Sequence, residues 1–403
     1  MRHPARLAPP RGFSLVELMV SIVIGMLALV LATRILLVSE QNKDVSLGGS
    51  DAMQNGMQAL FSVQSDLEQA GFGLNDPIIN GCDTIFEDSE KFTLASAMRG
   101  ATVITPLTAV VIKASATGSD ELSVYSGTSP TGTGSLGIST TSKGDATPTV
   151  DRTTFGFALN DVVVAANQNA DLNLKCVLAQ ITAEPPTDGS TPTIKLGGVA
   201  RFNSSKANTA TFNANSSRLF NLGRANDLAL HTWSAENGFL RLRATELAGA
   251  SLAPVTVVDN IVAIKAQYGF DTRPTADFSA DSGVQRTGMR LSTWSATMID
   301  ADGDGVIGDH DDWARVGAVR VAIVARSKNV EKPAPGTACS ATPADVTVFT
   351  TNEPKDVPAV PITLDLSVAG DTVGWKCYRY RVFETIVSLR NTGWRPTATR
   401  PSE

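Results

Sequence analysis

The sequence predicts an α+β protein in which a long N-terminal helix packs on an antiparallel β-sheet domain with long loops. Two patterns support this fold class. An apolar stretch near the N-terminus is long enough for a membrane-spanning helix, and after residue 75 the chain changes to short apolar runs between polar segments rich in Gly, Ser and Thr. The 403 residues are 42% hydrophobic and 18% charged, which is typical of a folded globular body.

A basic segment, residues 1–12, precedes the apolar stretch, in which Glu17 is the only charged residue between Phe13 and Arg34. A helix over residues 13–38 would be about 39 Å long, enough to cross a bilayer. Gly12 lies before this stretch, and no small-residue cleavage site clearly closes it, so cleavage next to Gly12 would leave the helix attached. The positive-inside rule then predicts a cytoplasmic leader and a body on the outer side of the membrane.

Glu17 is a carboxylate within an apolar helix, where a charge is costly and usually marks a function. It is the fifth residue of a chain that starts at Phe13. In a packed filament it can meet the free amine of a neighbouring chain's first residue, and a buried charge needs such a partner. The alternative is a plain signal anchor with an incidental Glu near its cytoplasmic end.

The segment Arg11-Gly-Phe-Ser-Leu-Val-Glu-Leu18 resembles the prepilin leader motif of type IV pilins and type II secretion pseudopilins. The resemblance implies that prepilin peptidase cleaves after Gly12 and that Phe13 becomes N-methylated. It also implies that Glu17 acts in filament assembly. Arg34 stands where many major pilins carry a helix-kinking Pro, so that kink is not expected here.

The helix is expected to continue over residues 39–72 as an amphipathic segment that packs against the sheet. One predicted core face contains Met53, Met57, Leu60, Gln64 and Leu67, which follow helical spacing. Gly48 and Gly49 are expected to interrupt the helix locally, and Gly71 and Gly73 to end it.

The β-rich domain is expected over residues 73–403. Its predicted strands are 109–113, 121–125, 161–166, 175–182, 239–243, 264–268, 316–327 and 378–389. The strands 316–327 and 378–389 alternate apolar and polar residues, which predicts half-buried antiparallel strands. The low-complexity segment 126–149 is predicted to be a long surface loop.

Three segments in the second half of the chain resemble the PilW group of minor pilins. They are residues 264–271, 316–327 and 378–391. The resemblance implies a structural role at or near the pilus tip, where the protein helps to initiate assembly and so supports adhesion and twitching motility. The implied partners are other minor pilins, the major pilin, prepilin peptidase, the inner-membrane assembly platform and a tip adhesin. The implied location is the inner membrane, as a single-pass protein with a periplasmic body, and then the pilus surface.

Two other functions remain open. One is a minor pseudopilin of a type II secretion system, and the other is an adhesive binding module at the tip whose long middle loops hold a surface ligand.

The four cysteines, Cys82, Cys176, Cys339 and Cys377, form no CxxC pair, which disfavours zinc and thioredoxin-like sites. An even number in an exported protein predicts two disulfides. Three pairings are possible, and we favour Cys82–Cys176 and Cys339–Cys377, each within its own half of the chain. The alternative is four free buried thiols.

Six acidic residues lie within residues 300–312, with the spacing of an EF-hand-type calcium loop. The ligands that this spacing predicts are Asp300, Asp302, Asp304, the carbonyl of Val306, and Asp311. Gly305 would supply the sharp turn, and Ile307 would hold the loop to the body. Asp311 replaces the usual Glu, and Asp309 or Asp312 are possible substitutes. We therefore expect a structural Ca²⁺, with a solvated acidic turn as the alternative.

Enzymes and nucleic-acid-binding proteins are both disfavoured. The net charge is −6 and the leader holds three of the 34 basic residues, so the body is acidic, whereas phosphate binding needs a basic face. Of the three histidines, His231 stands isolated in the sequence and His310 lies in the acidic loop. No phosphate-binding or nucleophile motif is present, so no catalytic function is expected.

Overall fold

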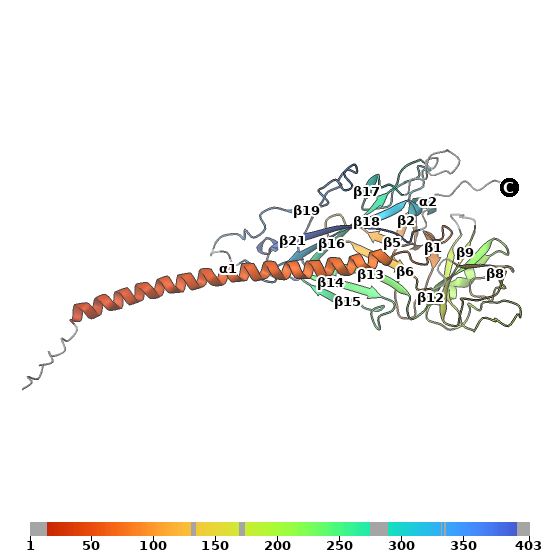
Figure 1. Ribbon diagram of the computed structural model, residues 1–403, viewed down its shortest axis with the longest axis horizontal. Helices are drawn as coiled ribbons and strands as arrows, with labels where there is room; N and C mark the ends of the chain where they lie inside the picture. Colours follow the sequence, from red (N-terminus) through yellow and green to blue (C-terminus); the bar gives the residue numbers. More distant parts are fainter. Residues whose placement is uncertain are drawn as a thin grey trace, which may run out of the picture. The chain divides into compact units, whose positions relative to one another are not determined.

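The computed structural model describes residues 14–129, 134–168, 174–274, 289–331, 333 and 336–392. In the first helix, the side chains of residues 38 and 40–47 are not described. The chain consists of two compact units, Met1–Asp51 and Ala52–Glu403. Helix α1, Leu15–Gln69, contributes to both units (Figure 1). The second unit is called the body below.

Helix α1 runs through Gly48 and Gly49, so the expected interruption there is wrong. Glycine lowers helix stability by only about 1 kcal/mol relative to alanine, and neighbouring turns outweigh that cost. The predicted stop is confirmed, because α1 ends at Gln69 and both Gly71 and Gly73 have positive φ (80° and 75°). Only glycine adopts such angles without strain.

The face of α1 that the body covers differs from the predicted one. Met53 and Met57 are 50% and 56% exposed, whereas Leu67 is fully buried as expected. The buried positions are Ala52, Gly56, Ala59, Val63, Leu67 and Ala70. At Gly56 a Cβ atom would overlap the ring of Phe383, so the backbone of the helix approaches β21 closely. Small side chains are used here because this contact leaves no room for methionine.

The strands of the body are short in the first half and longer in the second. They are β1 Cys82–Ile85, β2 Ala97–Arg99, β3 Thr102–Ile104, β4 Pro106–Leu107, β5 Val110–Lys113, β6 Glu121–Ser126, β7 Ser135–Gly137, β8 Ser142–Lys143, β9 Asp161–Asn167, β10 Cys176–Gln180, β11 Thr211–Phe212, β12 Ser217–Arg224, β13 Ala229–Glu236, β14 Phe239–Ala244, β15 Val255–Asp259, β16 Ile261–Phe270, β17 Thr293–Ser295, β18 Val316–Arg326, β19 Val346–Val348, β20 Ile362–Leu364 and β21 Tyr380–Ser388. Short helices are η1 Ser205–Thr209, α2 His310–Ala314 and η4 Trp375–Cys377. A long helix with mostly antiparallel strands confirms the α+β fold class.

Three sheets of the described residues make up most of the body. Their strand orders are β4-β1-β10-β9-β12-β7, β15-β14-β13-β6-β5 and β17-β16-β18-β21. The pair β1–β10 is parallel, and the other strand pairs in these sheets are antiparallel. Figure 1 shows β8, β9 and β12 grouped at one end of the body and β14, β15 and β21 toward the other. The main core joins the buried face of α1 to residues of all three sheets.

All eight predicted strands are present within two or three residues of their expected bounds. The segment 126–149 is not a plain surface loop, because it contains β7 and β8. Strands β12 and β13 were not expected. Their sequences break strict alternation with residues such as Asn221 and His231, which the fold buries or half-buries through specific partners.

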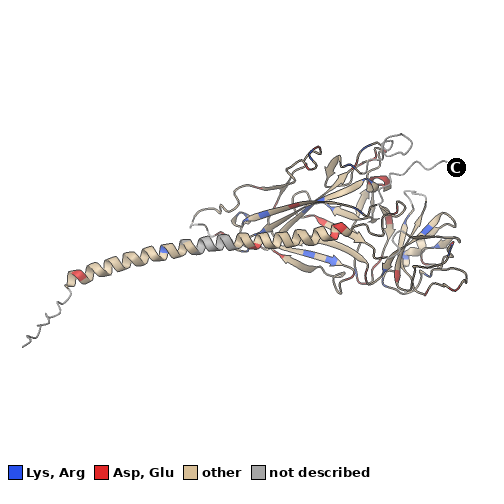
Figure 2. Ribbon diagram, in the orientation of Figure 1, with Lys and Arg blue, Asp and Glu red and all other residues tan. Residues whose placement is uncertain are grey.

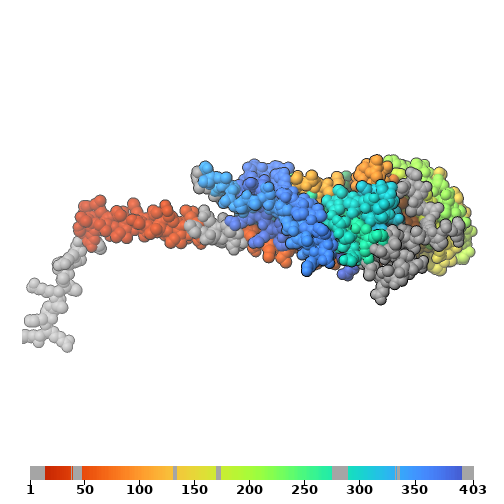
Figure 3. Space-filling model, turned by 90° about the horizontal axis from the view of Figure 1, so that it is seen from above, coloured from red at the N-terminus to blue at the C-terminus, as the bar shows by residue number. Residues whose placement is uncertain are grey.

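Strand β21 alternates between exposed and covered positions as predicted, but β18 is buried on both faces rather than half-buried. A second small core covers the outer face of β18, where Ala322 and Val324 pack with Val348 and Phe349. Figure 3 shows residues of this later part of the chain, coloured cyan to blue, along one face of the body. A strand whose sequence alternates apolar and polar residues can therefore be fully buried when a distant segment covers its outer face.

Both favoured disulfide pairings are confirmed. Cys82 is bonded to Cys176 and Cys339 to Cys377, with Cα–Cα distances of 6.0 and 4.9 Å. The first disulfide joins β1 to β10 within the six-stranded sheet, and the second ties the segment before β19 to η4.

Candidate functional sites

The first candidate site is the N-terminal part of α1. Residues Leu15–Leu37 form a segment of 23 residues with mean hydropathy 2.6, and it is the one helix in the described residues that is long and apolar enough to cross a membrane. Its side chains are exposed along the whole segment. In Figure 2 this part of the ribbon is almost entirely tan, whereas Lys and Arg are interspersed with Asp and Glu over the body. The first unit thus offers an apolar surface that only lipid or other apolar helices can cover.

Glu17 lies in the first turn of α1 and its side chain is exposed. The first turn carries the positive end of the helix dipole, which favours a carboxylate there. Gly12 and Phe13, the predicted processing residues, lie outside the described residues.

The second candidate site is the acidic loop between β17 and β18. The structure brings three of the predicted ligands together, because carboxylate oxygens of Asp300, Asp302 and Asp304 lie within 4.8 Å of one another. Asp300 accepts hydrogen bonds from the amides of Gly303 and Gly305 at 2.7 and 3.0 Å. The carboxylates of Asp302 and Asp304 accept the amides of Asp304 and Val306. The loop therefore curls its own backbone around the three carboxylates.

The other end of the loop is closed by Asp312 rather than by Asp311. Asp312 is fully buried, and its two carboxylate oxygens accept the amides of Ala301 (2.5 Å) and Gly308 (2.6 Å). Asp309 caps α2 by accepting the amide of Asp312. Asp311 does not belong to the group of three carboxylates, although its charge acts on Asp302.

Ile307 does not hold the loop to the body through its side chain, which is 44% exposed, so that expectation is wrong. Its carbonyl accepts the amide of Gly100 at 2.7 Å, on the β2–β3 hairpin. The apolar anchor is Trp313 in α2, which is 1% exposed and packs edge-on against Tyr268 at 5.9 Å between ring centroids. It also lies so close to Gly81 that a Cβ there would collide with it. Sequence spacing missed this anchor because it lies outside the loop motif.

Negative charge is concentrated in the loop beyond what the protein neutralises. Burial, together with the neighbouring carboxylates of Asp312 and Asp304, raises the pKa of Asp309 to about 7. Burial and the charges of Asp302 and Asp300 likewise raise the pKa of Asp312 to about 6. Both directions mean that a further positive charge would be favourable here.

His231 is not isolated in the structure. Its Nδ1 lies 2.8 Å from a carboxylate oxygen of Asp66 on α1, and its Nε2 lies 2.8 Å from Glu246. Trp233 donates its indole N–H to the second oxygen of Asp66. Burial opposes the charged imidazolium, but the two carboxylates outweigh it and raise the pKa of His231 to about 10. These residues hold the body portion of α1 on β13.

Comparison with known proteins places two matches at the two ends of the chain. The prokaryotic N-terminal methylation motif matches residues 9–33, which include Gly12, Phe13 and Glu17. The family of the type IV pilus-assembly protein W, PilW, matches residues 230–391, from β13 to just beyond β21. No curated protein and no solved structure matches the chain.

The PilW match covers the acidic loop and the four-stranded sheet, and the methylation motif covers the start of the apolar helix. This family is structural rather than catalytic, and its role in pilus assembly implies contacts with other pilus components. With a prepilin motif, one apolar helix that fits a membrane anchor, and a PilW-type C-terminal region, the chain matches a PilW-like type IV pilin.

Proposed function

We propose that this protein is a minor pilin that helps to initiate type IV pilus assembly at or near the pilus tip, without catalytic activity. The observation that carries the proposal is the presence of a methylation motif at residues 9–33 and a PilW match at residues 230–391 in one chain. In this role it supports adhesion and twitching motility.

The proposed mechanism begins in the inner membrane. Residues 1–12 stay cytoplasmic, prepilin peptidase cleaves after Gly12 and methylates Phe13, and the body lies in the periplasm. The apolar surface of residues 15–37 then packs among the helices of other minor pilins and the major pilin, with help from the assembly platform. Glu17 sets the register by pairing with the amine of a neighbouring first residue.

Mass spectrometry of the mature N-terminus tests the processing step. A chain that starts at methylated Phe13 is expected, whereas an intact Met1 would refute it.

Deletion of the gene separates the three functions. Loss of pili supports the assembly role. Intact pili with a defect in protein secretion would instead indicate a pseudopilin. Intact pili that fail to attach would indicate an adhesive binding module. In that case the protein itself would be the adhesin, and a separate tip adhesin would not be needed as a partner.

We also propose that the acidic loop binds one structural Ca²⁺ through Asp300, Asp302, Asp304 and the carbonyl of Val306. Asp311, the fifth ligand that the spacing predicts, lies outside the group of three carboxylates and would have to move toward the ion. Oxygen ligands about 2.3–2.6 Å from a Ca²⁺ ion lie within about 5 Å of one another, and the three carboxylate groups meet that requirement. A bound ion would offset the crowded negative charge and order the loop ahead of β18.

Isothermal titration calorimetry of the full chain in detergent micelles tests this ion. The double variant Asp302→Ala/Asp304→Ala should lose Ca²⁺ binding, and a chelator should make the loop of the unaltered protein sensitive to protease. Asp188→Ala, which removes an exposed acid elsewhere, serves as the control and should bind normally. Unchanged Ca²⁺ affinity in the double variant would exclude the site.

A further inference from the structure

Strand β21 is a long free edge of the four-stranded sheet. The edge strands of the three main sheets are β4, β7, β15, β5, β17 and β21. The first five are only two to five residues long, and the register of β15 with β14 is also irregular. In contrast, β21 has nine residues, contains no proline and pairs with β18 in an unbroken register. A long regular edge is a template for pairing with a further strand, and natural proteins usually avoid leaving one free.

The backbone of β21 carries hydrogen-bonding groups along this edge that no other strand uses. Leu389, the residue after β21, donates its amide to Gly317, directly opposite, at 3.0 Å. Because backbone groups alternate in direction in an antiparallel pair, those of Val382, Glu384 and Ile386 point away from β18. Apart from its pairing with β18, the backbone of β21 forms no hydrogen bond with the described residues. The edge therefore offers a row of donors and acceptors that an added strand can use.

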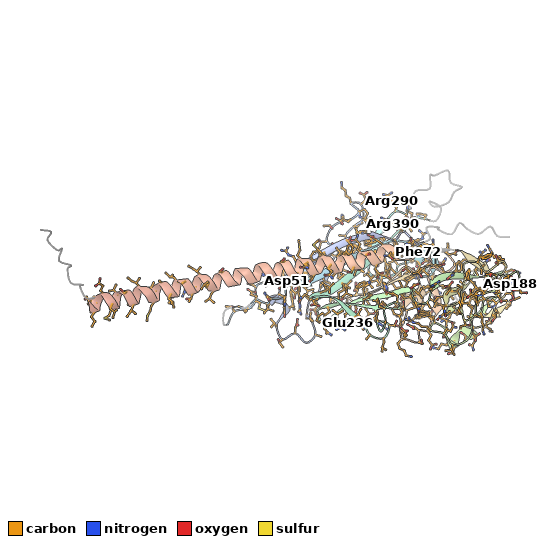
Figure 4. The ribbon with its side chains drawn as sticks, turned by 60° about the horizontal axis from the view of Figure 1, so that its bottom comes forward. Asp51, Phe72, Asp188, Glu236, Arg290 and Arg390 are labelled. Atoms are coloured by element: carbon orange, nitrogen blue, oxygen red, sulfur yellow. A yellow bond between two sulfur atoms is a disulfide. The ribbon has the colours of Figure 1, made fainter. Side chains whose placement is uncertain are left out.

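The body portion of α1 lies alongside β21. Gly56 approaches the ring of Phe383 so closely that no Cβ atom would fit between them. Asn391, just beyond β21, donates to the carbonyl of Ala70 at the end of the helix. Figure 1 shows β21 beside this part of α1, and Figure 4 labels Phe72 just beyond the end of the helix. The strand and the helix thus border the same surface of the body.

An uncovered apolar flank of α1 lies next to the free edge. On one side of the buried face, Asn55 donates to the carbonyl of Asp259 in β15 at 3.1 Å. Helical geometry places Met53 and Met57 on the other side, beyond Gly56 and its contact with β21. These two methionines are 50% and 56% exposed. Since β21 is the last strand of its sheet, a strand added to it would extend the sheet over this flank.

The outer face of the edge is also partly apolar. Val382 and Ile386 are 37% and 36% exposed on it. Glu384, which lies between them, accepts the amide of Phe349 at 2.8 Å. An added strand would therefore have apolar neighbours on both faces, which suits the continuous apolar runs of strands that are buried on both sides. A lipid could cover the apolar side chains but could not pair with the row of backbone groups.

A second copy of this chain does not fit the edge. Two identical edges pair antiparallel about a two-fold axis, so the body portions of the two α1 helices would run in opposite directions. In the proposed function, however, both chains are anchored in one membrane through residues 15–37 of that helix. The partner is therefore a different chain. Residues 15–37 pack among other pilus subunits in that function, and α1 continues from them to the flank beside β21, so these subunits lie within reach.

We propose that another subunit of the pilus adds a β-strand, with apolar side chains on both of its faces, to the free edge of β21. The inference rests on the proposed function and gives one of its contacts a place on the body. This place lies within residues 230–391, the region that matches PilW, and not in the first half of the body.

Site-specific photo-crosslinking in piliated cells is the direct test. The crosslinker p-benzoylphenylalanine replaces Ile386 in the full chain, and in a control it replaces Phe155, which is 71% exposed elsewhere on the body. Mass spectrometry then identifies the captured protein and the crosslinked segment. The expected result is capture at position 386, but not at 155, of a different protein with its own N-terminal methylation motif, through an apolar segment. No capture, capture of a second copy or of a protein without the motif, or equal capture at 155 would overturn the proposal.

A proline at the edge tests whether the backbone of β21 is used. Ile386→Pro removes an amide that points away from β18, and proline is tolerated at such edge positions. With the crosslinker placed at Ser388, Ile386→Pro should reduce capture about tenfold, because a pairing hydrogen bond is lost and the ring obstructs the edge. Ile386→Thr keeps the amide and the branched side chain, so it is the matched control and should capture nearly normally. Equal capture by the two variants would refute strand addition.

Circular dichroism of the purified variants confirms that they are folded. Val382→Pro removes another outward amide and takes the place of Ile386→Pro if that variant does not fold, with Val382→Thr as its control.

Pilus production separates this proposal from the proposed function. Pili that persist after deletion of the gene would refute the assembly role, whatever the crosslinker captures. Loss of pili in the deletion, together with normal capture by the proline variant, would refute the contact at β21 alone.

Discussion

The pKa of His231, raised to about 10, favours the charged form of a side chain that is only 14% exposed, because Asp66 and Glu246 contact its imidazole ring from both sides. A charge of this kind stabilises a fold only when its partners are already in position. Here the partners come from α1 and from the segment after β14, so the ring links the helix to the sheet through ionic hydrogen bonds.

Replacing His231 with Gln should lower the free energy of unfolding by about 3 kcal/mol at pH 6, since two carboxylates would lose their cation. The folded pKa of about 10 lies above the ordinary 6.5, so this stabilisation is fully present below about pH 6.5 and is lost as the pH rises through 10. Denaturation of the full chain at pH 6, 8 and 10 should show the difference between the two proteins shrinking steadily.

Trp233→Phe is the matched control for this prediction. It removes the hydrogen bond to Asp66 without removing a titrating group, so its cost of about 1–2 kcal/mol should not depend on pH. A His231→Gln effect that is equally constant between pH 6 and 10 would contradict the charged-histidine interpretation.

The burial and the contacts of individual side chains were the least predictable features of this chain. In the alternating sequence of β18, a charged residue such as Arg320 would be expected on an exposed face, yet Arg320 is 3% exposed. Its guanidinium lies over the rings of Trp294 and Phe349 and donates a hydrogen bond to the side-chain oxygen of Gln267. Burial lowers the pKa of Arg320 to about 10. Local alternation cannot reveal such a site, because its partners come from segments far away in sequence.

At the scale of elements, the body portion of α1 is shaped by how closely β21 approaches it. Helices pack closest where small residues face the contact, and Gly56 meets the Phe383 ring without a side chain of its own. Helical spacing predicted that one face of this segment is covered, but it placed Met53 and Met57 on that face, and both are exposed. Hydrophobicity alone does not show that a contact requires small residues.

Gly56→Ala should destabilise the body by about 2 kcal/mol, because the added methyl group must displace Phe383. Gly49→Ala is the matched control, since nothing lies within 4 Å of a Cβ there and alanine favours a helix by up to about 1 kcal/mol. Thermal unfolding of both variants measures the difference. Combining Gly56→Ala with Phe383→Leu should recover part of the loss, and equal melting temperatures for the two glycine variants would disprove the close contact.

The two disulfides should differ in their contribution to the free energy of unfolding. They close loops of 94 and 38 residues, for which the chain-entropy model gives about 5 and about 4 kcal/mol. Denaturant titration should therefore find the double variant Cys82→Ala/Cys176→Ala less stable than Cys339→Ala/Cys377→Ala. The opposite order would show that packing around the second disulfide, and not loop closure, dominates.

Strands were predicted where apolar and β-branched residues form continuous or alternating runs, as in β9 and β18. Strands β12 and β13 were not predicted, because Asn221 and His231 interrupt the run of apolar and β-branched residues. Asn221 is accommodated by the carboxylate of Asp161 and the carbonyl of Gly156, contacts that exist only once the sheet has formed.

At the scale of the whole molecule, the grouping of three carboxylates in the acidic loop was predictable, but the attachment of the loop to the body was not. Three carboxylates meet as the spacing predicts, whereas the loop is fixed by Trp313 and Asp312 and not by the side chain of Ile307. The order of strands within each sheet could not be deduced from sequence, since it depends on pairings between distant segments. The leader motif was the most informative feature because it reports processing, which needs no knowledge of the fold.

Glu17→Ala should leave cleavage after Gly12 largely intact and reduce incorporation into filaments by at least tenfold, because in the proposed mechanism Glu17 pairs with the amine of a neighbouring chain's first residue. Immunoblots of sheared pili and of membranes measure the two quantities. Glu68→Ala, which removes an exposed acid near the other end of α1, should be incorporated normally. Normal incorporation of Glu17→Ala would remove the charge-pairing mechanism while leaving the leader assignment in place.

The close approach of β21 to α1 also constrains how the protein is made. Asn391, just beyond β21, donates to the carbonyl of Ala70, which precedes it by 321 residues. The covered face of α1 can therefore be buried completely only after nearly the whole body has been synthesised. Until then the unfinished chain exposes apolar surface, which is the stage at which aggregation and proteolysis compete with folding.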